Sequence, residues 1–301
     1  MFWPYCGTLG ALALDGTPPV PDRARILLVT DLAYQARGRR YCDEDILLGA
    51  KLREHFDIAM CHPLEATLLM DAFDLVMIRN SGPVLYYRQA WDTFRAEASR
   101  QGTRVYNPLH GRGDMAGKQY LLDLTSAGYP VIPTVERIEH LDRLPAAESY
   151  AVKPGDGADS IGLEFLARHQ LSEATTGNRL IQPRIDFEYE VSFYFVDHEF
   201  QYALYAPDPQ RRWDLEPYAQ TRADLEFARR FVEWNTLEHG IQRIDACRTR
   251  DGDLLLVELE DLNPYLSLDR LSQDKQHRGL NAISASLRRV LSVTESPRPG
   301  R

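Results

Sequence analysis

Four short apolar runs, separated by amphipathic segments, dominate the first third of the chain. The runs lie at residues 25–31, 57–61, 74–78 and 104–107. Runs of this length with few polar positions are typical of strands buried on both faces of a parallel sheet. Segments 43–55 and 87–101, which lie between these runs, repeat apolar residues at helical spacing. The alternation predicts a small parallel α/β domain.

The pattern after residue 112 mixes helices with alternating strands. Helices are predicted at 114–127, 223–239 and 278–292, and strands at 149–153, 179–182, 188–206, 244–247 and 253–260. The Asp-Gly pair between the last two strands is a strong signal for a hairpin turn. Residues 188–206 alternate over a length that suits a long hairpin. This half of the chain is therefore predicted to be α+β with antiparallel sheets.

Composition and charge exclude several classes of protein. With 44% apolar and 26% charged residues, the chain is predicted to be globular. Its formal net charge of −9 argues against a nucleic-acid partner, which requires a basic surface. No apolar run approaches the ~20 residues of a membrane helix. We expect a cytoplasmic protein, because residues 1–14 lack the basic start of a secretion signal and the cysteines (Cys6, Cys42, Cys61, Cys247) show no paired spacing.

Lysine is scarce, which makes its positions informative. Four of the 35 basic residues are lysine: Lys51, Lys118, Lys153 and Lys275. Lys153 ends a predicted strand and leads into a glycine-rich segment that contains Gly155, Gly157, Ser160 and Gly162. Backbone amides, a hydroxyl and a cation are groups that bind polyphosphates. The segment has neither a Walker loop ending nor dinucleotide-fingerprint spacing, and a plain β-turn is the alternative.

The last predicted hairpin ends in carboxylates. Its turn is centred on the Asp-Gly pair, so Asp245 falls opposite Glu258, with Glu260 further along the same face. Carboxylates placed side by side repel each other unless a cation is present, and oxygen ligands suit magnesium. A solvated acidic edge is the alternative. A bulge near Glu260 would bring Asn263 to this face instead, but a regular strand favours Glu260 as the third ligand.

The order of these parts resembles the ATP-grasp superfamily, and within it the carboxylate–amine ligases of the bacterial glutathione synthetase and D-alanine ligase type. Lys118 opens a helix, Lys153 ends a strand, a glycine loop and an apolar strand follow, and the carboxylate hairpin comes last. The resemblance covers about residues 25–292. It includes residues 77–83, which are similar to the strand-end loop of the synthetases.

The resemblance implies an α/β fold, in part α+β, in which two subdomains clamp ATP between antiparallel sheets. The predicted organisation is an N-terminal arm (1–24), a parallel α/β domain (25–112), an ATP-grasp domain (113–292) and a tail (293–301). The ATP-grasp domain would divide into a lid subdomain at about 130–185 and a metal-binding core at 186–292.

The resemblance also implies roles for individual residues. Lys118 and Lys153 would contact the α- and β-phosphates, with Lys153 also near the adenine and residues 155–162 closing over them as a lid. The adenine edge would be read by Gln182 and by the backbone through Arg184 and Ile185. The ribose would be held by Glu190, with Glu188 as the competing position. Mg²⁺, or Mn²⁺ in its place, would be held by Asp245, Glu258 and either Glu260 or Asn263.

The implied activity is ATP-dependent activation of a carboxylate as an acyl phosphate, which an amine then attacks to give an amide or peptide bond. Arg79, Arg211 and Arg212 are candidate partners of the substrate carboxylate or the γ-phosphate, because arginine pairs with both in a bidentate manner. Arg211 and Arg212 would assist Lys153 in catalysis. The partners would be small-molecule carboxylates and amines, and a homo-oligomer is left open. The alternatives are an ATP-grasp kinase or phosphotransferase and a non-catalytic ATP-binding assembly factor.

Overall fold

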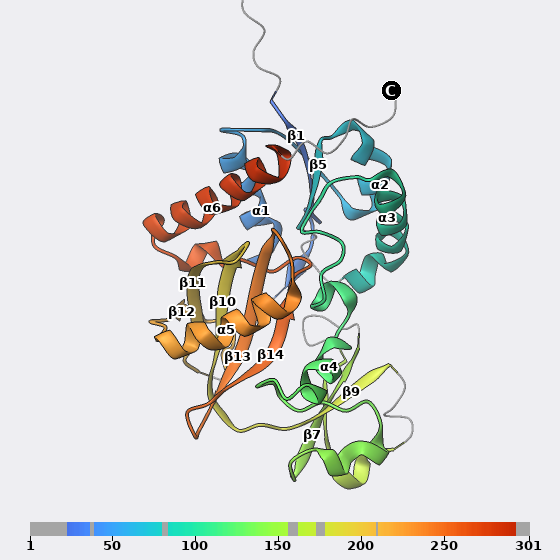
Figure 1. Cartoon of the computed structure of the whole chain (residues 1–301), viewed down its shortest axis with the longest axis vertical. Helices are drawn as coiled ribbons and strands as arrows, with labels where there is room; N and C mark the ends of the chain where they lie inside the picture. The colour runs from blue at the N-terminus through green and yellow to red at the C-terminus, as the bar shows by residue number, and fades with distance from the viewer. Residues whose placement is uncertain are drawn as a thin grey trace, which may run out of the picture.

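The computed structural model describes residues 23–36, 39–79, 84–155, 162–172, 178–208 and 210–292. Most of the predicted arm, the whole predicted tail and part of the strand-end loop lie outside these residues. Gly157 and Ser160 of the glycine-rich segment also lie outside them. The described chain forms three larger sheets, of which two lie beside the long C-terminal helix and the third lies at the end of the molecule away from it (Figure 1).

The first sheet is parallel and consists of the apolar runs predicted as strands. Its order is β4 (Asp57–Cys61), β1 (Arg25–Val29), β5 (Leu75–Ile78) and β6 (Val105–Tyr106). Its flanking elements are α1 (Cys42–Leu52), α2 (Ala66–Leu69), α3 (Arg88–Gln101) and a ribbon of β2 (Gln35–Ala36) and β3 (Arg39–Arg40). Ile26 and Leu28 of β1 pack on the α1 side, whereas Leu27 and Val29 pack on the α2 and α3 side. Both faces are covered, which explains the unbroken apolar runs.

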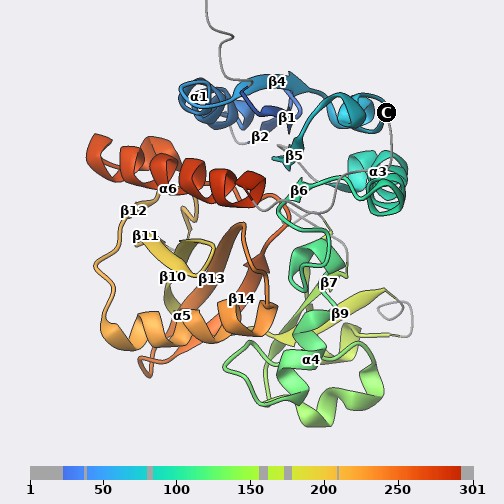
Figure 2. The same ribbon diagram turned by 45° about the horizontal axis from the view of Figure 1, so that its top comes forward.

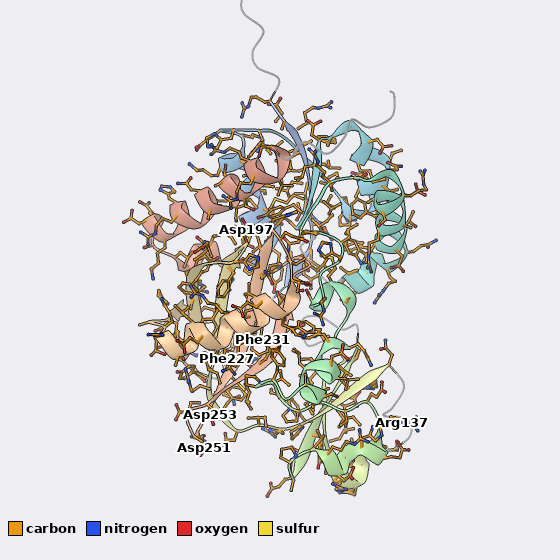
Figure 3. All side chains as sticks on the ribbon, in the orientation of Figure 1. Arg137, Asp197, Phe227, Phe231, Asp251 and Asp253 are labelled. Atoms are coloured by element: carbon orange, nitrogen blue, oxygen red, sulfur yellow. The ribbon has the colours of Figure 1, made fainter. Side chains whose placement is uncertain are left out.

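The second sheet is antiparallel and has five strands. Its order is β12 (Glu216–Pro217), β11 (Glu199–Ala206), β10 (Phe187–Val196), β13 (Ile241–Thr249) and β14 (Leu254–Glu260). Helix α5 (Arg222–Asn235) covers one face, where Phe227 and Phe231 join an apolar core with Phe193 and Leu256 (Figure 3). The β13–β14 hairpin turns at the Asp-Gly pair that was predicted as its turn.

Helix α6 (Gln273–Ser292) lies between the parallel sheet and the five-stranded sheet (Figure 2). Leu280, Ile283 and Leu287 share one apolar cluster with β1 and α1 on one side and with Tyr194 and Tyr202 on the other. The two sheets therefore have a common core through this helix. Among the described helices, none is both long enough and apolar enough to span a membrane.

The third sheet is antiparallel, with the order β8 (Glu164–Ala167), β7 (Ser149–Pro154) and β9 (Arg179–Pro183). Helix α4 (Tyr120–Ser126) precedes it. Val131 forms a parallel bridge to Leu256 of β14, and Val135 forms an antiparallel bridge to Ile181 of β9. The segment that contains Val131 and Val135 therefore connects the second sheet to the third.

Several predicted elements differ from the structure, and four of the differences concern helices or a strand near the site. The helix predicted at 114–127 is interrupted, because Gly117 has a φ of +90° that an α-helix cannot accommodate. Helix α5 stops at Asn235, where Thr236 takes a left-handed conformation. Helix α6 begins at Gln273, earlier than predicted. Strand β8 was not predicted, and its half-exposed residues carry no apolar alternation.

Candidate active site

One face of the five-stranded sheet is polar where three of its strands adjoin. The side chains on this face are Glu190 and Ser192 of β10, Arg243 and Asp245 of β13, and Glu258 and Glu260 of β14. Intervening residues point to the opposite face, where they pack against α5. Strand alternation therefore separates an apolar core from a charged surface within the same strands.

The register of the β13–β14 hairpin confirms the predicted pairing of its carboxylates. Asp245 lies opposite Glu258, and Arg243 lies opposite Glu260. The register shifts by one residue between Asp245 and Ala246, so the bulge precedes Glu258. Glu258 and Glu260 thus keep the regular spacing that puts both on the face of Asp245.

The two predicted phosphate-binding lysines meet at this face. Lys118, only 8% exposed, forms an ion pair with Glu258 at 2.9 Å. Its backbone N–H donates to the carbonyl of Gly155 at 2.6 Å, which ties the start of the glycine-rich segment to this lysine. Burial and the neighbouring charge of Lys118 lower the pKa of Lys153 to about 8, although Glu258 opposes the shift. Both lysines therefore act on the same carboxylate.

The carboxylates on this face have different proton affinities. Burial alone would raise the pKa of Glu258, but Lys118 and Lys153 outweigh it and hold the pKa below its usual range. Burial, with Asp245 and Glu258 nearby, raises the pKa of Glu260 to about 8 in spite of Arg243. Of these two glutamates, Glu258 is therefore the one that is held more firmly in its ionised form.

Arg243 is a site residue that sequence reasoning missed. Its guanidinium pairs with Asp245 at 2.8 Å and with Glu260, and it also donates to the carbonyl of Tyr265 at 3.0 Å. The Asp245 carboxylate further accepts from Ser192 Oγ at 2.6 Å. The Arg-Ile-Asp spacing could have identified Arg243, because residues two apart on a strand share a face.

Of the two candidate arginines between β11 and β12, Arg211 and Arg212, the structure brings one to the polar face. Arg212 pairs with Glu190 at 2.6 Å. Burial raises the pKa of Glu190, and Arg212 opposes that shift. Arg211 instead pairs with Asp208 at 3.0 Å and Asp214 at 3.2 Å on its own loop, with 67% of its side chain exposed. Glu188, the competing position for ribose, is exposed.

The predicted adenine-binding residues lie along the end of β9. Gln182 is 4% exposed, and its amide nitrogen donates to Thr134 Oγ1 at 2.8 Å. The Thr134 hydroxyl itself donates to the carbonyl of Ile132 at 2.9 Å, so it must accept from Gln182. This network directs the amide oxygen of Gln182 away from Thr134. Arg184 is exposed with its guanidinium 5.3 Å from the Phe165 ring centre, and Ile185 is half-buried.

The substrate role predicted for Arg79 is corrected by its surroundings. Arg79 is 3% exposed and pairs with Glu44 at 2.9 Å and Asp45 at 2.8 Å of α1. It also donates to the carbonyl of Pro264 at 2.9 Å. Burial raises the pKa of Glu44 to about 8, although Arg79 opposes the shift. Arg79 therefore joins α1 to the loop after β14, and this structural role occupies its guanidinium.

Two glycines of the predicted lid are described, and each occupies a position that a larger residue would strain. A Cβ on Gly155 would lie 2.5 Å from the side-chain oxygen of Asn178. Gly162 has a φ of +74° and would meet the Pro154 ring at 2.9 Å. Asn263 lies beyond the end of β14, in the loop that Arg79 holds through Pro264.

No protein-family model matches the chain. The cycloserine biosynthesis protein DcsG of Streptomyces lavendulae is 26% identical to it, over 76% of this chain and 88% of that protein. Among solved structures, D-cycloserine synthetase DcsG superposes with a TM-score of 0.71 at 22% identity, covering 87% of this chain and 99% of that one.

Two further solved structures have the same architecture. D-alanine–D-alanine ligase from Bacillus anthracis, in complex with ATP, gives a TM-score of 0.66 at 13% identity and covers 89% of this chain and 98% of that one. The ATP-grasp ligase PsnB, in complex with a minimal precursor, gives a TM-score of 0.61 at 17% identity and covers 88% of this chain and 99% of that one. The described chain therefore has the ATP-grasp fold that the order of its motifs implied.

Proposed function

We propose that this protein is an ATP-dependent ligase that activates the carboxylate of an amino acid or small peptide as an acyl phosphate and joins it to an amine. One observation carries the proposal: Lys118 pairs with Glu258 at the polar face of the five-stranded sheet, and the charge of Lys153, from a separate segment, acts on the same carboxylate. The fold neighbours support it, since they include a D-cycloserine synthetase and a D-alanine–D-alanine ligase bound to ATP.

The lysines would bind the phosphates of ATP. Lys118 is positioned by its pair with Glu258 and by the Gly155 carbonyl, so phosphate oxygens would replace part of an existing ion pair. Lys153 is half-buried, and loss of solvation lowers its pKa. An anionic phosphate beside it would raise the pKa again and so stabilise the charged form. Gln182 would accept from the adenine amine, and Glu190 would hold the ribose.

The oxygen ligands on the polar face fit magnesium. The described residues contain no group of three or more His, Cys, Asp or Glu side chains that could hold a metal ion. Magnesium needs only one or two carboxylates when nucleotide phosphates supply further oxygens. Asp245 and Glu258, paired across the hairpin, meet that need. When bound, the cation would neutralise phosphate charge. We propose Glu260 rather than Asn263 as a third ligand that joins only in the nucleotide-bound protein, since Glu260 pairs with Arg243 in this structure.

Arg212 and Arg243 add positive charge where phosphoryl transfer would require it. Such transfer depends on positioning and on neutralising charge rather than on covalent chemistry by the protein. Arg212 lies at the edge of the polar face through its pair with Glu190 and would stabilise the transferred γ-phosphoryl. Arg243 would orient Asp245 and Glu260, because it bonds to both.

The two loop arginines give a matched test of this assignment. Arg212→Ala is expected to lower kcat by about tenfold or more, whereas Arg211→Ala should stay within about twofold of wild type, because it loses only exposed ion pairs. Rates of ADP formation at saturating ATP would measure both. Equal losses in the two variants would show that the loop, and not the Arg212 guanidinium, matters for turnover.

Product analysis tests the proposed function itself. The protein would be incubated with ATP, magnesium and amino acids in pairs, and ADP release and product mass would be followed. A ligase yields ADP, phosphate and a product whose mass is the sum of the two substrates less one water. A phosphorylated product that forms without an amine would identify a kinase. Nucleotide binding without turnover would identify an assembly factor, and either outcome contradicts the ligase proposal.

We further propose the division of the ATP-grasp part at about residues 130–185 and 186–292, a cytoplasmic location and small-molecule partners. The separate three-stranded and five-stranded sheets support the division. The net charge of −9 favours small-molecule partners over nucleic acid. Homo-oligomerisation stays open, and the mass in solution would decide it.

A further inference from the structure

A reciprocal set of hydrogen bonds ties together two segments that are far apart in the chain. The Asp261 carboxylate accepts from the backbone N–H of Gly113 and of Met115, each at 2.9 Å and each with a different oxygen. The Asp114 carboxylate returns two bonds, since its Oδ1 accepts from the N–H of Asp261 at 2.7 Å and of Leu262 at 2.9 Å. We call Asp114 and Asp261 with these four bonds the carboxylate clasp.

The clasp is buried and closely packed. Asp261 is 0% exposed and accepts a third hydrogen bond, from the side-chain amide of Asn235 at 2.9 Å. A Cβ on Gly113 would lie 2.7 Å from the carbonyl oxygen of Leu259 and 3.0 Å from the carboxyl carbon of Asp261. The backbone at Gly113 therefore approaches β14 as closely as only glycine permits.

The position of the clasp links it to the site. Lys118 follows Met115 by three residues, and Glu258 precedes Asp261 by three residues. The segment after Met115 and the segment before Asp261 therefore start from the clasp, and they contact each other a second time through the Lys118–Glu258 ion pair at 2.9 Å. Beyond that pair, the hydroxyl of Tyr120 accepts from the N–H of Leu259 at 2.7 Å. The ion pair is thus held from both sides.

We propose that the carboxylate clasp is a positioning device that sets the distance between Lys118 and Glu258. This inference rests on the proposed function, in which Lys118 binds phosphate and Glu258 binds magnesium. Asp114 and Asp261 are positioning residues, because they bond to the backbone of the two segments that carry Lys118 and Glu258. The clasp fixes the geometry before ATP arrives, so binding energy is not spent on ordering it.

The hydrogen bonds predict unequal effects for two similar substitutions. Both carboxylate oxygens of Asp261 accept hydrogen bonds from N–H groups. In Asp261→Asn one oxygen is replaced by an N–H₂ group, which would face an N–H donor whichever way the amide is turned, so at least one hydrogen bond is lost. Asp114 receives both backbone bonds on one oxygen, so Asp114→Asn keeps them and turns its N–H₂ toward the Asp261 carboxylate. Asp114→Ala loses these bonds. We therefore expect damage from Asp261→Asn and Asp114→Ala but not from Asp114→Asn.

Labelling of lysines measures the position of Lys118 without any reference to ATP. With four lysines in the chain, an amine-acylating reagent followed by mass spectrometry reports each one separately. We expect Lys118 to react several-fold faster in Asp261→Asn and Asp114→Ala, with Lys51 and Lys275 unchanged. ATP affinity, measured by calorimetry, should fall by about tenfold in the same two variants, because Lys118 and Glu258 are no longer held at a fixed spacing before ATP binds.

Asp224→Asn is the matched control for general loss of stability. Asp224 is also buried and also uses both oxygens, toward Thr221, Tyr218 and Arg248, but it lies at the start of α5. It should lower the melting temperature without changing Lys118 labelling or ATP affinity. If Asp261→Asn and Asp114→Ala remain folded with wild-type Lys118 labelling, the clasp does not position this lysine. If labelling rises but the wild type binds no ATP, the clasp stands and the proposed function fails.

Discussion

Replacement of Lys153 by methionine is expected to lower the rate of ADP formation by on the order of 10²–10³-fold, the loss typical when one preorganised donor to a developing charge is removed. Methionine is unbranched and close to lysine in volume, so the core behind β7 should remain intact. The melting temperature should stay close to that of the wild type. Calorimetric titration with ATP and a continuous ADP assay would measure the two effects.

Lys51→Met is the control, because Lys51 pairs with Glu54 on the surface of α1, away from the polar face. The pH dependence adds a second signature. Burial and Lys118 lower the pKa of Lys153 to about 8, so the free protein loses this charge as pH rises above 8. Bound phosphates favour the charged form of Lys153, so above pH 8 ATP binding is accompanied by proton uptake at this lysine. ATP affinity therefore falls as the pH rises above 8. An unchanged affinity profile in Lys153→Met would remove Lys153 from the phosphate site.

Glu258→Gln is expected to raise the magnesium concentration needed for half-maximal activity by at least about tenfold and to reduce the maximal rate, because it removes a charged metal ligand and the partner of Lys118. Asp245→Asn should have a similar effect on the magnesium requirement. Glu260→Gln tests the third ligand, and we expect it to raise the magnesium concentration needed for half-maximal activity by less than Glu258→Gln does. Activity titrated against magnesium after removal of divalent ions with chelator would give all three values.

Asp253→Asn serves as the control within the same hairpin. Asp253 is exposed at the turn (Figure 3), whereas Asp245 and Glu258 pair further along the strands, so its loss should leave the magnesium requirement unchanged. Full turnover of the wild type in excess chelator would contradict the metal assignment altogether. If Asn263→Ala raises the magnesium concentration needed for half-maximal activity and Glu260→Gln does not, the third ligand is Asn263 of the loop and not Glu260 of the strand.

The parts of the fold that follow from local patterns could be predicted from the sequence. Apolar runs gave the four parallel strands, because both faces of that sheet are covered. Counting outward from the Asp-Gly turn gave the observed pairing of Asp245 with Glu258, but the strands pair one residue away from that count next to the turn, and the bulge between Asp245 and Ala246 restores it. The bulge before Glu258 was not predictable, because its position depends on how β14 packs.

Contacts between distant segments could not be predicted. Arg79 reads as one of many arginines until α1 places Glu44 and Asp45 beside it. Asp261 looks like another acid in an acidic run, yet its carboxylate faces the backbone of Gly113 and Met115 and not the polar face. Arg211 and Arg212 are equivalent in sequence, and only the course of their loop directs one of them to Glu190.

The position of α6 determines where the chain can be cut. A fragment that began at residue 113 would retain every proposed ATP ligand, but it would leave Leu280, Ile283 and Leu287 without the residues of β1 and α1 that cover them. It would also remove Arg79 from the carbonyl of Pro264, which it holds beside the end of β14. We therefore expect that the nucleotide-binding half does not fold as an autonomous unit and that a shortened protein for biochemical work should keep residues 23–112.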